Sequence, residues 1–415
     1  MSFKEQALKT AGLGLNYVIG AATILAVPHL MVPPQDVYEG NNTSTQVPSI
    51  LKKNNVKKPL IITDANLMKF GVTKPMLDAL DAEGYTYAIY DKVEPNPTIA
   101  NIEDAFAMYR ENGCDSIIGF GGGSSMDSAK AVSGRVVKPN MTIKQMGRLM
   151  GYLPISLPYA GRTPLTIAIP TTAGTGAEST PASVISDHES DKKYTVTDGL
   201  IRPDVAVLDP TLAIGLPKFQ TAITAIDAVS HCIEGYIGLA HNARDDEFAE
   251  QGVRLVFDYV DRAYKDGKDI EARAALTKAA YDGGQGLNSG TTGYIHPFCH
   301  KIGAMYNLPH GRCIGAVMPI ILEDYGTAVE KRLGKLGAAA GISDPSADAS
   351  AQAKQFIQAL RDYDDKYGID QHIPELKEED FPEIADSIMK EIFVYPTKVV
   401  YSREDIYRVL RKIKG

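Results

Sequence analysis

The chain has 415 residues, of which 44% are hydrophobic and 23% are charged, as in ordinary globular proteins. Its length exceeds the size at which a single hydrophobic core keeps growing, so we expect two domains. The formal net charge of -8 argues against nucleic acid as a partner, because phosphate backbones are bound through clustered lysine and arginine.

The N-terminal segment contains an apolar run, Ala11 to Val27, that follows Lys4 and Lys9. It resembles a secretion signal only superficially, because Glu5 stands among the lysines and no A-x-A cleavage triplet follows. The 17 residues of the run are also few for a membrane span. We therefore expect residues 1–30 to form a helical extension, with no membrane partner.

The cysteines are few for so long a chain, and none of them forms a CxxC pair: Cys114, Cys232, Cys299 and Cys313. Such a pattern does not indicate a disulfide framework. We expect reduced thiols and a cytoplasmic location.

The first half alternates short apolar runs with helical stretches. Strands are expected at 60–63, 85–90, 116–120, 165–169 and 205–208. Runs this apolar, bounded by Gly, Pro and Asp, are typical of a mostly parallel sheet that helices cover on both faces. The pattern predicts an α/β domain whose ligands gather at the carboxyl ends of the strands.

Beyond about residue 215 the strand signal fades and helical periodicity takes over. Helices are expected at 222–236, 271–281, 351–367 and 384–393. Ser402-Arg-Glu-Asp405 resembles a capping box, and the last helix that it opens ends in Arg411-Lys-Ile-Lys414. The second half is therefore predicted to be an all-α domain.

Two glycine-rich loops follow predicted strands. The first, Gly121-Gly-Gly-Ser-Ser-Met-Asp127-Ser-Ala-Lys130, gives the order strand, glycines, helix. Its backbone N–H groups and the helix N-terminus could hold a pyrophosphate, although it is neither a G-x-G-x-x-G nor a P-loop and could be a plain tight turn. The second, Pro170-Thr-Thr-Ala-Gly-Thr-Gly-Ala-Glu178, could line the same cleft or could be a simple loop.

Asp64 ends the strand 60–63 and has two possible roles. As a helix N-cap it would be purely structural. As a carboxylate at a strand's carboxyl end it could accept both ribose hydroxyls of NAD and would repel the extra phosphate of NADP.

A cluster of metal-ligand residue types stands in the second half. Asp227 and His231 are spaced i, i+4 on an expected helix, His296 and His300 repeat that spacing, and His310 follows in a turn. Imidazole and carboxylate suit divalent iron, zinc or cobalt. The alternative is a capping aspartate with a satisfied core histidine, which two clusters together make improbable.

Three neighbours of these histidines affect the prediction. Pro297 fits only the first turn of a helix, so His296 is expected at a helix start. Cys232 and Cys299 adjoin His231 and His300, but consecutive helical residues point about 100° apart, so we expect the thiols to face the core.

These segments together resemble the iron-containing, group III alcohol dehydrogenases along nearly the whole chain. The resemblance rests on Gly-Gly-Gly-Ser-x-x-Asp-x-x-Lys at 121–130, Pro-Thr-Thr-Ala-Gly-Thr at 170–175, Asp-Ala-x-x-His at 227–231, and His-x-x-x-His with Pro-His-Gly at 296–311. It implies a dehydroquinate-synthase-like dinucleotide-binding domain at 1–215, a helical metal-binding domain at 216–415 and an active site in the cleft between them. It also implies a homodimer or larger homo-oligomer.

The resemblance further implies roles for individual residues. The metal would be held by Asp227, His231, His296 and His310, with His300 acting beside the nicotinamide instead of on the ion. The NAD(H) contacts would come from Asp64, Asn96, Gly122, Gly123, Ser124, Asp127, Thr171, Thr172, Thr175 and Lys193. Without the resemblance, Asn96 reads equally well as a turn former and Lys193 as a solvated surface charge.

The implied activity is interconversion of a small primary alcohol or diol and its aldehyde, dependent on NAD(H) and on Fe²⁺, with Zn²⁺ possible. One alternative is a dehydroquinate-synthase-like or glycerol-dehydrogenase-like metal and NAD enzyme. A synthase would need a cluster of basic residues for an anionic substrate, which the segment from Asp227 to His310 does not contain. Another alternative is a non-catalytic scaffold with a relic site, so the chemistry of the site must decide.

Overall fold

The computed structural model describes residues 12, 14, 15, 18, 34–150, 163–188, 192–288, 291–392 and 395–415. Among these, one compact unit, here the α/β unit, comprises 34–216 and 267–281. The other, here the helical unit, comprises residues 12, 14, 15, 18 and 217–266 and the described residues from 282 onward. Most of the predicted extension at 1–30 lies outside the described residues, although 12, 14, 15 and 18 are helical.

The α/β unit is built on a sheet of six parallel strands in the order β1-β8-β5-β4-β2-β3. The strands are β1 (Asp36–Glu39), β2 (Pro59–Ile62), β3 (Ala88–Tyr90), β4 (Ser116–Gly121), β5 (Leu165–Pro170) and β8 (Val205–Leu208). All five predicted strands are confirmed. The short edge strand β1 was missed because its sequence, Asp-Val-Tyr-Glu, is flanked by charge at both ends and carries little apolar signal.

A second, antiparallel pair also escaped the sequence analysis. It consists of β6 (Ala182–Asp187) and β7 (Lys192–Thr197). These strands are rich in serine, aspartate and lysine, so they lack the apolar runs by which strands were recognised.

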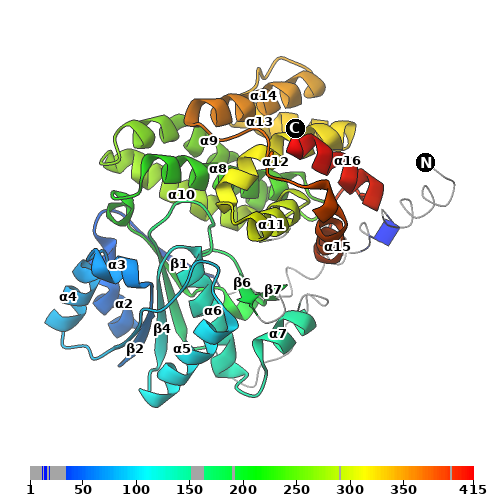
Figure 1. Ribbon diagram of the computed structural model, residues 1–415. Coiled ribbons are helices and arrows are strands. Elements are labelled where there is room, and N and C mark those ends of the chain that lie inside the picture. Colours follow the sequence, from blue (N-terminus) through cyan, green and yellow to red (C-terminus); the bar gives the residue numbers. More distant parts are fainter. Residues whose placement is uncertain are drawn as a thin grey trace. The chain divides into compact units, whose positions relative to one another are not determined.

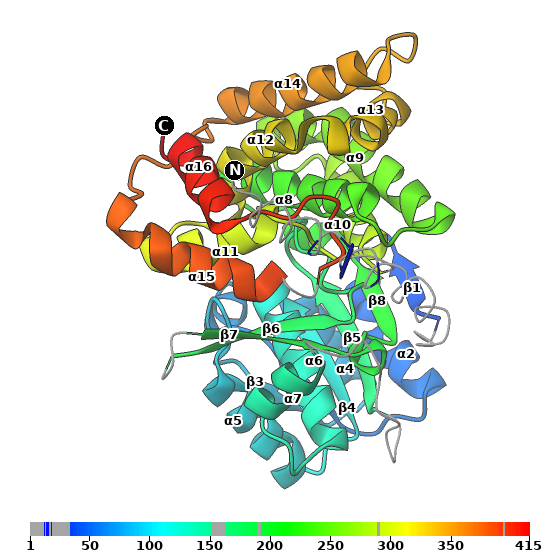
Figure 2. The same ribbon diagram turned by 90° about the vertical axis from the view of Figure 1, so that its right-hand side faces the viewer.

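Helices cover both faces of the parallel sheet (Figure 1 and Figure 2). They are α2 (Val47–Lys53), α3 (Ala65–Lys69), α4 (Lys74–Ala82), α5 (Ile99–Glu111) and α6 (Gly123–Val137), whereas α7 (Ile143–Met150) packs against β7. Alternate residues of a strand serve opposite faces: Leu60 and Ile62 pack in the cluster of α5 and α6, whereas Ile61 packs in that of α2 and α4. This confirms the predicted sheet buried on both sides.

The described residues beyond 217 form helices and the loops between them, and every helix predicted there is confirmed. The helices are α8 (Lys218–Ile237), α9 (Ala243–Lys265), α10 (Ile270–Gly286), α11 (Ile295–Tyr306), α12 (His310–Tyr325), α13 (Glu330–Ala339), α14 (Ala349–Tyr367), α15 (Phe381–Glu391) and α16 (Arg403–Lys414). Helix α8 packs against α9 and α12 and is buried on nearly all sides over its second half. None of the described helices is long and apolar enough to cross a membrane.

The last helix begins as predicted. The Ser402 hydroxyl accepts from the backbone N–H of Asp405, and the Asp405 carboxylate accepts from the backbone N–H of Ser402. The capping box is thus confirmed, and cations occupy the last turn of α16, where the helix dipole favours them.

Candidate metal centre and coenzyme loops

Three helices of the helical unit carry the predicted metal ligands. Asp227 and His231 lie one turn apart on α8, and both are buried. His296 lies in the first turn of α11, so Pro297 is accommodated where proline is tolerated, as expected. Asn307 ends α11 in the left-handed conformation with φ 52, and α12 then begins at His310.

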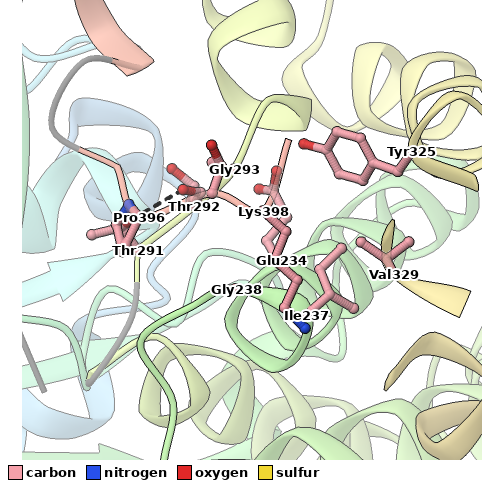
Figure 3. Close-up of a pocket in the computed structure, with 11 residues that line it drawn as sticks. Glu234, Ile237, Gly238, Thr291, Thr292, Gly293, Tyr325, Val329, Pro396 and Lys398 are labelled. Atoms are coloured by element: carbon pink, nitrogen blue, oxygen red, sulfur yellow. Dashed lines mark hydrogen bonds between the residues drawn. The ribbon is translucent and has the colours of Figure 1, made fainter. Parts of the chain in front are cut away.

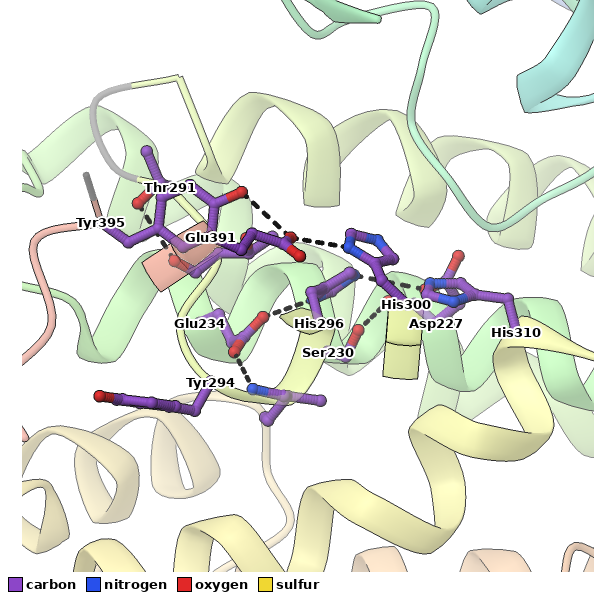
Figure 4. Close-up of polar contacts among 12 residues, drawn as sticks. Asp227, Ser230, Glu234, Thr291, Tyr294, His296, His300, His310, Glu391 and Tyr395 are labelled. Carbon is purple, nitrogen blue, oxygen red and sulfur yellow. Dashed lines mark hydrogen bonds and ion pairs between the residues drawn. The ribbon is translucent and has the colours of Figure 1, made fainter. Parts of the chain in front are cut away.

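The side chains of Asp227, His296 and His310 lie close together (Figure 4). One ligand atom each from Asp227, His231 and His296 lies within 4.8 Å of the others. Nε2 of His310 is 3.4 Å from Oδ1 of Asp227, and its side chain is 37% exposed, whereas the other three are buried. The structure therefore brings all four predicted ligands together.

The fit to a cation can be tested on the buried polar atoms. Among the described residues, Oδ1 of Asp227 and Nε2 of His296 have no hydrogen-bond partner, and they face each other at 3.8 Å. Buried polar atoms without a partner are costly, and a divalent ion would satisfy both. Three imidazoles and a carboxylate are a donor set that suits Fe²⁺ and Zn²⁺ alike, so the residues fit such an ion.

Glu234, which the sequence analysis did not assign, orients one of these ligands. From α8 its carboxylate is paired with Nδ1 of His296 and accepts from the backbone N–H of Ile295 at 2.8 Å. Burial alone would lower the pKa of His296, but the carboxylates of Glu234 and Asp227 outweigh it and raise the pKa to about 10. A metal ion and a proton therefore compete for Nε2 of His296.

Glu234 also lines a small pocket of the helical unit (Figure 3). The pocket is bounded by Thr292, Tyr325 and Lys398 among others, and its space of about 20 Å³ holds roughly one water molecule. It is too small for a substrate.

His300 lies beside the ligands but has a different partner. Its ring is 5.7 Å from that of His296 and 5.4 Å from that of His310, centroid to centroid. Its Nδ1 is 2.8 Å from Oε1 of Glu391, a residue of α15 that the sequence analysis also missed. Its hydrogen-bond partner is thus a carboxylate outside the four candidate ligands, in line with a role off the ion.

The cysteines do not join this group. Cys232 and Cys299 are fully buried free thiols, and burial raises the pKa of both. A buried thiol with a raised pKa stays protonated and is a poor metal ligand. This agrees with the prediction that they face the core.

In the α/β unit, the two glycine-rich loops lie side by side, because β4 and β5 are neighbours. A Cβ added to Gly123 would meet Cγ2 of Thr175 at 2.9 Å, and one added to Gly122 would meet Oγ1 of Thr172 at 3.6 Å. Helix α6 begins at Gly123, with Gly122 as N-cap, so the Ser124 N–H belongs to the first turn, where N–H groups lack intrahelical acceptors. Thr171 donates its N–H to the Gly121 carbonyl at 2.9 Å.

Asp64 follows β2, the strand next to β4, at the same edge of the sheet. It is the N-cap of α3, where Oδ1 accepts from the N–H groups of Asn66 and Leu67 at 2.9 and 3.1 Å. Asp64 therefore caps the helix as one of its two predicted roles, and the cap uses only Oδ1. A role toward ribose stays a proposal.

The remaining coenzyme candidates differ in their surroundings. Lys193 Nζ donates to Oδ1 of Asn96 at 3.0 Å, which brings these two together, and Asn96 adopts a left-handed turn conformation with φ 58. Asp127 instead accepts from the Val184 N–H at 3.0 Å and pairs with the buried Lys130 at 2.8 Å. The Asp127 carboxylate thus connects α6 to β6. Because both of its oxygens already have protein partners, the structure favours a coenzyme contact at the glycines over one at Asp127.

Two family models match the chain: iron-containing alcohol dehydrogenase over residues 34–210, and the C-terminal part of the Fe-containing alcohol dehydrogenase family over residues 221–414. The chain therefore belongs to the iron-containing alcohol dehydrogenase family and is an oxidoreductase. Neither the synthase-like alternative nor the scaffold is favoured.

Individual relatives match over almost their whole length. Alcohol dehydrogenase 4 of Saccharomyces cerevisiae is 32% identical over 391 residues, which are 93% of this chain and 98% of the relative. NAD-dependent methanol dehydrogenase of Bacillus methanolicus is 31% identical over 385 residues, 92% of this chain and 99% of the relative. The solved alcohol dehydrogenase from Oenococcus oeni gives a TM-score of 0.84 at 29% identity, covering 92% of this chain and 98% of that one. The predicted fold class is confirmed.

Proposed function

We propose that the protein is an NAD(H)- and divalent-metal-dependent alcohol dehydrogenase that interconverts a small primary alcohol or diol and its aldehyde. The observation that carries the proposal is the convergence of the ligand atoms of Asp227, His231 and His296, with Nε2 of His310 3.4 Å from Oδ1 of Asp227. Among the described residues, Oδ1 of Asp227 and Nε2 of His296 have no hydrogen-bond partner. We assign these four residues as the metal ligands, with Fe²⁺ favoured by the family and Zn²⁺ equally suited to the donors.

In this proposal a divalent cation supplies Lewis-acid polarisation of the alcohol or carbonyl oxygen. The residues of the chain set the conditions for it. Asp227 contributes the negative charge among three imidazoles, and Glu234 holds Nδ1 of His296 so that Nε2 points at Asp227. His300, off the ion and 22% exposed, moves a proton to or from the substrate oxygen.

The α/β unit supplies the coenzyme site. A nicotinamide coenzyme bound there would supply hydride transfer. We assign its pyrophosphate to the start of α6, at Gly122, Gly123 and Ser124, next to the loop that holds Thr171, Thr172 and Thr175. Asp64 favours NAD over NADP by repelling a 2′-phosphate. The Bacillus methanolicus relative is an NAD-dependent methanol dehydrogenase, which supports both the coenzyme and a small alcohol.

The test is a coenzyme and substrate panel. Metal-loaded protein is assayed with NADH or NADPH against propanal, butanal and larger aldehydes, beside the variant Asp64→Ser. We expect NADH and short aldehydes to be preferred, and we expect Asp64→Ser to narrow the preference for NADH. Absence of turnover with every short aldehyde and alcohol would refute the proposal, and an unchanged coenzyme preference in Asp64→Ser would refute the role of that carboxylate.

A further inference from the structure

We propose that Glu391 is a positioning residue for His300. Its carboxylate keeps the ring hydrogen on Nδ1 and thereby presents the lone pair of Nε2 to the proton of the substrate hydroxyl. The inference rests on the proposed function, in which His300 handles that proton, and it names the residue that makes His300 competent.

The geometry of the pair carries the inference (Figure 4). Nδ1 of His300 and Oε1 of Glu391 are 2.8 Å apart, although the two residues are separated by 91 positions in the chain. Their side chains are 22% and 24% exposed, so the pair is largely shielded from water while the imidazole remains accessible. A hydrogen bond to a carboxylate in such surroundings is stronger than one in bulk solvent.

A third residue fixes the carboxylate in turn. The Tyr395 hydroxyl is 3.3 Å from the same oxygen, Oε1 of Glu391. A glutamate carboxyl is ionised at neutral pH and can act only as an acceptor, so the hydrogen between the two residues belongs to His300.

The tautomer decides what His300 can do. A neutral imidazole with its hydrogen on Nδ1 has its lone pair on Nε2. In alcohol oxidation the hydroxyl proton passes to Nε2 as the carbinol carbon loses its hydride to the oxidised coenzyme, and the resulting imidazolium is stabilised by the Glu391 carboxylate. In aldehyde reduction the same proton returns from Nε2 to the oxygen.

A second ion pair between the same two helices provides a control for the effect of helix packing alone. Lys301, next to His300 on α11, pairs with Glu383 of α15 at 2.6 Å. This ion pair joins the same two helices as the pair of His300 and Glu391, but it does not involve the imidazole. A substitution at Glu383 therefore weakens the contact between α11 and α15 without touching the proton-handling group.

The experiment compares Glu391→Ala, Glu391→Gln and the control Glu383→Gln in the full-length, zinc-loaded protein. Metal content, kcat and KM are measured. The ¹⁵N NMR signals of labelled histidine are recorded as well, and the signal that disappears in His300→Asn is assigned to His300. We expect Glu391→Ala to lower kcat by about 10- to 100-fold with KM changed by less than about threefold. Glu391→Gln should retain more activity, because the amide oxygen still accepts from Nδ1. The control should match the wild type.

The ¹⁵N spectra report on the pair independently of turnover. The wild type should show His300 protonated on Nδ1, and Glu391→Ala should shift it toward the Nε2-protonated tautomer. Three results would overturn the inference: loss of metal in the Glu391 variants, a fall of kcat in Glu383→Gln equal to that in Glu391→Ala, or an unchanged His300 tautomer in Glu391→Ala. If the wild type turns over no alcohol, the proposed function fails, and the tautomer alone then decides whether Glu391 orients His300.

Discussion

At the scale of single residues, the arrangement around His296 shows how a carboxylate away from the ion can control a ligand. Glu234 is 2% exposed and engages both Nδ1 of His296 and the backbone N–H of Ile295. Such partners fix the orientation of a ligating imidazole and raise its basicity.

Glu234→Gln is expected to weaken metal affinity by about 10- to 100-fold, because an amide no longer supplies the charge that favours a basic imidazole. The measurement is a metal-binding titration of stripped protein. The control Glu323→Gln changes an exposed residue of α12 that pairs with Arg361, and it should bind metal like the wild type. Equal affinity in Glu234→Gln and wild type would show that His296 needs no such support.

The sequence could have revealed Glu234 but not Glu391. Glu234 lies three residues after His231 and seven after Asp227, so helical periodicity places all three on one face of α8. Glu391 reaches His300 only because α15 packs against α11, and a contact across 91 residues leaves no local pattern. The helical spacing of Asp227 with His231 and of His296 with His300 predicted a metal site. Only the family resemblance implied His310 in place of His300 as the fourth candidate ligand, and their convergence required the fold.

At the scale of elements, the start of α6 depends on the absence of a side chain at Gly123. Gly123→Ala would place a Cβ 2.9 Å from Cγ2 of Thr175, so the threonine must rotate and disturb the paired loops. We expect the Kd for NADH to rise by about tenfold, equivalent to ~1.4 kcal/mol, with the fold and metal content unchanged.

Gly215→Ala is the matched control, because a Cβ at Gly215 would meet nothing within 4 Å in the same unit. Fluorescence titration with NADH distinguishes the two variants. If Gly123→Ala bound NADH with wild-type affinity, the start of α6 would not be part of the coenzyme site.

Helix α14 carries a buried carboxyl that makes stability depend on pH. Burial raises the pKa of Asp364 to about 8, and neither of its oxygens has a hydrogen-bond partner among the described residues. In the unfolded chain the pKa is about 3.9. Between these values the folded protein holds a proton that the unfolded chain has released, so stability falls as the pH rises from about 4 to about 8, by up to ~1.4 kcal/mol per unit.

Asp364→Asn removes this titration. From about pH 5 to about pH 8 the Tm of the wild type should therefore fall more than that of the variant, by roughly several degrees. Asp362→Asn, at an exposed position of the same helix, should follow the wild type. Parallel Tm curves for Asp364→Asn and wild type would contradict a protonated Asp364 in the folded state.

The elements that the sequence predicted well share a strong, regular pattern. The five apolar strands and the long helices follow periods of two and 3.6 residues or unbroken apolar runs. Strands β6 and β7 have no such pattern and were not predicted. They are stabilised by pairing with each other and by contacts between residues far apart in the sequence, such as that of Asp127 with Val184.

At the scale of the whole molecule, the two kinds of site belong to different units. The four candidate metal ligands and His300 all lie in the helical unit, and the ten candidate coenzyme residues lie in the α/β unit. Metal binding and coenzyme binding should therefore be separable by substitution. The family resemblance also implies a homo-oligomer, which light scattering on the purified protein would measure.

The most direct test of the account is the rate of NADH oxidation with propanal as a function of the metal bound to previously stripped protein, in wild type and in His310→Ala. We predict that the wild-type rate rises with bound Fe²⁺ or Zn²⁺ until about one ion is bound per chain, and that the stripped protein is inactive. His310→Ala should retain little metal and little activity while binding NADH with nearly unchanged affinity. Full turnover by stripped wild-type protein, or a loss of NADH affinity in His310→Ala, would contradict the central claim.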